Sequence, residues 1–154
     1  MVLSGEMWDM FIGEYNHSVD AKGRVSLPSR FREELSSTFY ITRGLESCLF
    51  IYDAAAWQAM DAKLSQSRLT AKSARDFSRL FYSGAMEVSC DKQGRFLIPP
   101  HLRAFAEIDK EAVIIGVSHR IEVWAKDKWD AYLASDAMNY DDLSAALDES
   151  GMDL

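Results

Sequence analysis

One sequence pattern occurs twice in this chain and limits what it can fold into. The first occurrence is Val19 to Arg32, VDAKGRVSLPSRFR, and the second is Cys90 to Arg103, CDKQGRFLIPPHLR. Identical Asp, Gly, Arg, Pro and Arg residues recur at one constant offset, as from Asp20 to Asp91. After a one-residue shift the match continues through Ile41, Gly44, Ile51, Tyr52 and Trp57, which align with Val113, Gly116, Val123, Trp124 and Trp129. The chain is therefore a duplicated unit, and a fold with two equivalent halves is expected.

Each repeat has the pattern of a tight hairpin followed by a helix. Gly23 and Gly94 supply the positive φ that a tight turn needs. The short apolar segments Val25–Leu27 and Phe96–Ile98 are typical strands. A proline follows each of them, and its fixed φ suits the first turn of a helix. Because two such small units bury too little surface alone, we expect them to share one core.

The turn of each hairpin carries polar side chains that packing does not require. An arginine fork matches the O6 and N7 edge of guanine, and lysine suits phosphate. The Asp four residues before each Arg is placed to hold the guanidinium or to accept from turn N–H groups. A single D-x-x-G-R can equally be a solvated turn, but its recurrence in one frame favours a function. The candidate DNA-binding residues are Lys22, Arg24, Arg30, Lys92 and Arg95, with Asp20, Gly23, Asp91 and Gly94 supporting the turns.

Three segments resemble the MraZ family of bacterial transcriptional regulators. They are MFIGEYNHSVDAKGRVSLPSRFREEL from Met10, DKQGRFLIPPHLR, and VIIGVSHRIEVWAKDKWDAY ending at Tyr132. The resemblance implies two SpoVT-AbrB-type domains and sequence-specific binding to double-stranded DNA by ring-shaped homo-oligomers. It also implies repression at the promoter of the division and cell-wall gene cluster, the regulator's own gene included.

The expected architecture is α+β: a duplicated SpoVT-AbrB-like β-barrel core with peripheral helices. Asp53 and Thr70 are expected to cap two helices. The apolar positions Ala74, Phe77, Leu80 and Phe81 predict either a core face or a subunit contact. We expect an extension and first strand at 1–13, domain 1 at 14–56, a helical linker at 57–84, domain 2 at 85–128, and a C-terminal helix with an acidic tail at 129–154.

The chain has no apolar run long enough for a membrane span and no basic-then-apolar signal at its start. Its 154 residues, 48% of them hydrophobic, predict a globular protein. We expect it in the cytoplasm, associated with the nucleoid and not with a membrane. Residues 1–9 precede the family pattern and are assigned no function.

The charge distribution is unusual for a DNA-binding protein. The segment from Asp136 onward contributes −6 of the net charge of −7, because it contains six acids and no Lys or Arg. The rest of the chain is nearly neutral, so DNA binding depends on local basic clusters and on several weak contacts acting together. The tail is either a solvated, weakly helical end or a segment that competes for the basic tips.

Catalysis and metal binding have little support in the sequence. His17, Ser18 and Asp20 are too close along an extended segment to assemble a triad. The three histidines lack metal-ligand spacing, Cys48 and Cys90 form no C-x-x-C pattern, and there is no phosphate-binding loop. We therefore expect no enzyme, metal or cofactor. Two alternatives to DNA binding stay open: a ring-forming scaffold for protein partners, and an AbrB-type protein with an antitoxin-like role.

Overall fold

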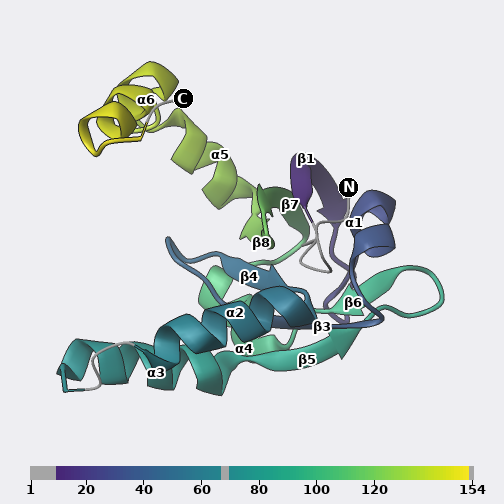
Figure 1. Cartoon of the computed structure of the whole chain (residues 1–154). Coiled ribbons are helices and arrows are strands. Elements are labelled where there is room, and N and C mark those ends of the chain that lie inside the picture. The colour runs from purple at the N-terminus through teal and green to yellow at the C-terminus, as the bar shows by residue number, and fades with distance from the viewer. Residues whose placement is uncertain (1–9, 67–69, 153–154) are drawn as a thin grey trace.

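The structure, a computed structural model, describes residues 10–66 and 70–152, so residues 1–9 lie outside the described part (Figure 1). Both repeats follow the same order of elements. The first repeat contains β1 (Phe11–Ser18), β2 (Arg24–Ser26), α1 (Ser29–Glu34), β3 (Thr38–Arg43), β4 (Leu49–Tyr52), α2 (Ala54–Ser65) and α3 (Lys72–Gly84). The second contains β5 (Met86–Ser89), β6 (Arg95–Leu97), α4 (Pro100–Ala106), β7 (Glu111–Ser118), β8 (Arg120–Ala125), α5 (Lys126–Ala134) and α6 (Tyr140–Glu149).

The two repeats are interlaced in one antiparallel sheet of order β1-β7-β8-β4-β3-β5. The first strand of each repeat pairs with the third strand of the other, β1 with β7 and β5 with β3. The fourth strands, β4 and β8, pair at the centre. If each strand is replaced by its counterpart in the other repeat, the same strand order is obtained, read from the opposite edge. This symmetry indicates an intrachain pseudo-two-fold axis.

The strand register corrects the alignment of the two repeats. Ser18 faces Glu111 and its counterpart Ser89 faces Thr38, so Thr38 corresponds to Glu111. Ile41 therefore corresponds to Ile114, and the expected match with Val113 is wrong. The difference matters because a shift of one residue turns a side chain to the other face of the sheet. Ile41 and Ile114 both lie in the main core, whereas Val113 lies in the layer on the opposite face.

The main core lies between the sheet and the two hairpins. The second strands of the repeats, β2 and β6, pair with each other in a two-stranded ribbon. Val25 and Phe96 face each other in this ribbon and are both 1% exposed. Phe96 makes an edge-to-face contact with Phe39, the two ring centroids being 5.9 Å apart. Side chains from both repeats thus fill a single core, as expected.

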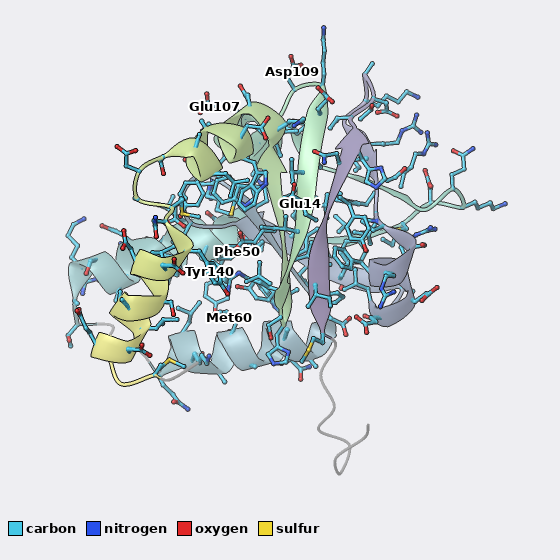
Figure 2. All side chains as sticks on the ribbon, turned by 90° about the horizontal axis from the view of Figure 1, so that it is seen from above. Glu14, Phe50, Met60, Glu107, Asp109 and Tyr140 are labelled. Carbon is cyan, nitrogen blue, oxygen red and sulfur yellow. The ribbon has the colours of Figure 1, made fainter. Side chains whose placement is uncertain are left out.

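A second apolar layer covers the other face of the sheet. Phe50, in β4, is buried there, and Met60, in α2, packs against the layer (Figure 2). Trp57 of α2 stacks on Phe81 of α3 with centroids 5.5 Å apart. From the second repeat, α5 contributes Trp129. None of the described helices is both long and apolar enough to cross a bilayer.

The mixed α+β class is confirmed, and the helix starts are partly corrected. Asp53 is the N-cap residue of α2, as expected, but its carboxylate makes no capping hydrogen bond and accepts from Ser36 instead. Thr70 is not a cap, because α3 begins after Ala71. Of the expected apolar stripe only Phe81 is buried; Phe77 and Leu80 are exposed.

Candidate nucleic-acid interface

The first hairpin tip, Asp20–Arg24, is closed by the Asp20 side chain. Its Oδ1 accepts from the backbone N–H groups of Lys22 (3.0 Å) and Arg24 (2.8 Å). Its Oδ2 accepts from Arg24 Nε at 2.8 Å. The Gly23 N–H donates to the Asp20 carbonyl, and Gly23 has a φ of +90°. One carboxylate therefore shapes the turn and holds the guanidinium.

The second tip, Asp91–Arg95, repeats this geometry. Asp91 Oδ1 accepts from the N–H groups of Gln93 (2.9 Å) and Arg95 (3.0 Å), and Oδ2 accepts from Arg95 Nε at 3.1 Å. The expected roles of both aspartates as guanidinium holders and turn acceptors thus coexist in the same side chain. In each tip the aspartate engages Nε and so holds the guanidinium beside the turn.

The ribbon brings the two arginines to one surface. Arg24 faces Leu97 and Arg95 faces Ser26 across the β2–β6 pairing. Because Val25 and Phe96 point into the core, strand alternation turns these four side chains to the outer face of the ribbon. The side chains of Arg24 and Arg95 are 34% and 29% exposed, and Arg95 Nη1 lies 3.9 Å from Asp20 Oδ2. The two tips therefore form one site.

Each turn glycine accommodates an arginine from the other repeat. A Cβ at Gly23 would collide with the Arg103 guanidinium, and a Cβ at Gly94 would collide with that of Arg32. Arg103 Nε also donates to the Ile98 carbonyl at 3.0 Å. The repeated arginine at the end of the motif, which sequence reasoning left without a role, thus packs against the tip of the partner repeat.

The remaining candidate cations differ in position. Lys22 and Lys92 are exposed in the two tips, next to the paired arginines. Arg30 lies elsewhere, in a hollow of α1 lined also by Met10, Ile12, Phe31, Glu33 and Glu34. That hollow adjoins the start of β1, whereas the first tip follows its end, about 23 Å further along the eight-residue strand. The structure therefore brings Arg24 and Arg95 together on one ribbon face, with Lys22 and Lys92 beyond opposite ends of the ribbon, and it places Arg30 apart from them.

Two site residues were not foreseen from the sequence, Ser26 and Leu97. They share the outer ribbon face with the arginines, and Leu97 is 46% exposed. A hydroxyl and an apolar side chain there offer a hydrogen bond to a base edge and a contact with a thymine methyl group. The available signal was strand alternation: positions that flank Val25 and Phe96 must point outward.

Hydrogen bonding lowers the pKa of both tip aspartates below the ordinary value of 3.8. The main cause is the backbone N–H of Arg24 for Asp20 and that of Arg95 for Asp91. The ionised carboxylates therefore stabilise the folded tips above the unfolded-chain pKa, and this contribution is lost as the pH falls through the lowered pKa.

We expect a carbon-13 NMR titration of the side-chain carboxyls to give midpoints below 3.8 for Asp20 and Asp91. Both tips should then be unchanged between about pH 6 and 8, where all these carboxyls are ionised. A midpoint at or above 3.8 for either tip aspartate would contradict the observed turn geometry.

The other polar groups of the described residues do not include a metal-binding cluster. Among residues 10–66 and 70–152, no three His, Cys, Asp or Glu side chains are grouped so as to hold a metal ion. Cys48 is buried and Cys90 is half-buried, and burial raises the pKa of both thiols. His101 contacts the Gly84 carbonyl at 3.0 Å, which is a structural role.

Comparison with known proteins identifies close relatives. A family model described as "MraZ protein, putative antitoxin-like" matches residues 10–80 and again 81–149. A protein of Finegoldia magna is 53% identical over 140 residues, covering 91% of this chain and 98% of the relative. One from Alkaliphilus metalliredigens is 48% identical over 143 residues, covering 93% of this chain and all of the relative. Both relatives carry the name "Transcriptional regulator MraZ".

Proposed function

Because the chain belongs to the MraZ family, we propose that it is a sequence-specific DNA-binding regulator of transcription that contacts base edges with the outer face of the β2–β6 ribbon. The observation that carries this proposal is the pair Arg24 and Arg95, each held by an aspartate on one exposed ribbon face. A two-stranded ribbon has the dimensions to enter the major groove of B-DNA.

The aspartates prepare the arginines for base recognition. Each carboxylate binds Nε and leaves the terminal nitrogens of the fork available for the O6 and N7 atoms of guanine, although Arg95 Nη1 also lies 3.9 Å from Asp20 Oδ2. A guanidinium already held in place loses less conformational entropy on binding than a mobile one. Lys22 and Lys92 would contact the neighbouring phosphates. Lacking any base-specific geometry, they would strengthen binding to every sequence.

One ribbon is too small a surface for tight binding, so we propose that several act together in a ring of subunits. Head-to-tail neighbours in a ring repeat one orientation, and they would therefore recognise direct repeats about one helical turn apart. Simultaneous engagement raises the overall affinity without new contacts. This multivalency would also offset the unfavourable net charge of −7. We propose repression of the division and cell-wall gene cluster, the regulator's own promoter included, as the biological output.

We also propose that the described strands amount to a SpoVT-AbrB-type barrel. The support is spatial: the ribbon contacts β1 through β2 and β5 through β6, and β1 and β5 are the two edges of the sheet. The domain limits 14–56 and 85–128 remain a proposal for the two repeat cores. Because β1 and β5 each pair with the other repeat, these segments would not be independent folding units.

A protein-binding role is the second candidate. Exposed apolar residues on α3 and α6 favour it, as does the antitoxin-like description of the matching family. The salt dependence of DNA binding separates the two functions. Phosphate-contacting proteins weaken steeply as salt rises, whereas a scaffold has no specific complex to lose.

Footprinting of the protein's own upstream DNA should show protected direct repeats that contain guanine. Affinity for this DNA is expected to fall by at least tenfold between about 50 and 200 mM salt, because several phosphate contacts release counterions. A scrambled probe of equal length is the control, and it should bind weakly at every salt concentration. A single palindromic footprint would contradict the head-to-tail arrangement. Absence of any specific shift from folded, oligomeric protein would favour the scaffold.

A further inference from the structure

The C-terminal helix α6 presents an apolar stripe that its own chain leaves exposed. Tyr140, Leu143 and Leu147 follow helical spacing and are 81%, 44% and 39% exposed. No described residue of α6 is buried. Figure 1 shows α5 and α6 forming an arm that extends away from the sheet, on the side opposite the ribbon. Apolar residues gathered on one helix face are typical of a helix that packs against a partner.

The charges of α6 indicate what kind of partner it needs. Its ten residues include four acids and no base, and two of the acids, Asp148 and Glu149, lie in the last turn. Negative charge at a helix C-terminus opposes the helix dipole. A helix of this length is also marginal in water without tertiary contacts. A partner surface that is apolar and bordered by cations would provide tertiary contacts for this short helix and would neutralise the acids at its C-terminus.

The equivalent helix of the first repeat shows why α6 does not pack on its own sheet. Helix α3 is anchored to β3: Thr42 Oγ1 donates to the Phe81 carbonyl and Arg43 Nη1 to the Leu80 carbonyl, each at 2.6 Å. In the register of the second repeat the corresponding residues are Ile115 and Gly116. Neither has a side-chain donor, so α6 cannot be anchored in the same way.

The exposed side of α3 has the matching properties. This helix carries three basic residues, Lys72, Arg75 and Arg79, and one acid. Its apolar residues Phe77 and Leu80 are 44% and 57% exposed. We propose that α6 of one subunit docks on α3 of a second molecule of this chain, apolar stripe against Phe77 and Leu80, with its acids beside the α3 cations. The inference rests on the proposed ring, for which it names the contact between neighbours.

Such a contact joins two different surfaces. In a pair of subunits, one α6 and one α3 therefore remain free to bind further subunits. Its repetition is head-to-tail, which closes rings or extends filaments. It also assigns the acidic tail a role: its charge is used at the subunit contact, on the side of the molecule opposite the DNA-binding ribbon (Figure 1). Neutralised there, it does not compete with DNA for the tips.

The contact is tested by two variants of the full chain. A stripe variant, Leu143→Asp with Leu147→Asp, removes the apolar face of α6. An α3 variant, Arg79→Glu with Leu80→Asp, alters only exposed side chains of the other surface. Each is expected to raise the concentration needed for assembly at least about tenfold, seen as smaller species by light scattering after size exclusion. Ala145→Asp, at an exposed position on the opposite face of α6, is the matched control and should assemble normally.

Mixing the two variants identifies the pairing. The intact α6 of the α3 variant can dock on the intact α3 of the stripe variant, so the mixture should form one-to-one dimers that grow no further. Pairing of α6 with α6, or of α3 with α3, would give no mixed dimer and would overturn the proposal. So would unchanged assembly of either variant.

The test is independent of DNA recognition. In circular dichroism, both variants should unfold at the same thermal midpoint as the unaltered protein. A variant that lacks a cooperative transition is replaced by Leu147→Ser or Leu80→Ser, for which the same results are expected. A wild-type monomer that still binds specific DNA would refute the contact and leave the regulator intact. A normal assembly without DNA binding would refute the regulator and leave the contact intact.

Discussion

Replacement of Arg24 by alanine is expected to lower the affinity for the specific operator about 10- to 100-fold per contacted site. The estimate is the loss of one bidentate guanine contact, about 1–3 kcal/mol. In a multivalent complex the loss recurs at each engaged subunit, so the measured effect can be larger. Gel shift or fluorescence anisotropy with operator and scrambled probes provides the measurement.

Arg95→Ala should lower the affinity for the specific operator less than Arg24→Ala does. Arg95 Nη1 is also within 3.9 Å of Asp20 Oδ2, so its fork is shared between two carboxylates, and its side chain is the less exposed of the two. The second tip also lacks a lysine directly before its glycine, where Gln93 stands in place of Lys22. Equal losses, or a greater loss for Arg95→Ala, would contradict this ranking.

Arg24→Lys is the matched control for charge. Lysine keeps the positive charge but lacks the planar fork. We expect Arg24→Lys to keep its affinity for the scrambled probe. The ratio of its affinities for the operator and scrambled probes should fall to the ratio measured for Arg24→Ala. Retained discrimination would mean that Arg24 contacts phosphate and not a base. The thermal midpoint should change little in all three variants, since an exposed ion pair contributes little stability.

Replacement of Phe96 by alanine is expected to destabilise the whole chain by about 3–5 kcal/mol, the usual cost of emptying a buried aromatic site. Phe96 is 1% exposed, faces Val25 of the other repeat and contacts Phe39 edge to face. Its loss therefore opens a cavity in the shared core and not in one half. Urea unfolding followed by fluorescence and by circular dichroism gives the free energy of unfolding.

The interlaced sheet also predicts that Phe96→Ala unfolds in one transition. Single-tryptophan variants that keep either Trp57, on α2, or Trp129, on α5, report on the two repeats separately. Their transitions should coincide, because β1 and β5 cannot leave one repeat without unpairing the other. Leu97→Ala, one residue along the same strand but 46% exposed, is the control and should change stability by less than about 0.5 kcal/mol. Two separated transitions would contradict a shared core.

Local chemistry along the chain was enough to predict the hairpins and their tips. An aspartate, a glycine with positive φ and an arginine occupy a five-residue turn, so their hydrogen bonds form within the turn itself. The duplication predicted two equivalent halves because similar segments make similar local structures, and the small size of each unit predicted that they share one core. The family resemblance, confirmed by the matches over both repeats, rested on three longer segments, two of which contain these turns.

Helix starts and apolar stripes were predicted less well, because they depend on what lies nearby in space. Asp53 is the N-cap residue of α2 as expected, but its carboxylate accepts from Ser36, seventeen residues away, and makes no capping hydrogen bond to the helix. Phe77 and Leu80 continue the apolar spacing of Phe81, yet only Phe81 reaches the sheet. Spacing identifies a helix face, and only the packed neighbours decide whether that face is covered.

Residue order in the sequence therefore determined the two turns, their held arginines and the twofold plan. The tertiary structure decided which strands pair. This pairing places Arg24 and Arg95 on one ribbon face and makes Ile41 correspond to Ile114. The physical reason is the range of the interactions. Turn hydrogen bonds span four residues, whereas β1 and β7 pair across about a hundred, and no local pattern specifies a partner at that separation.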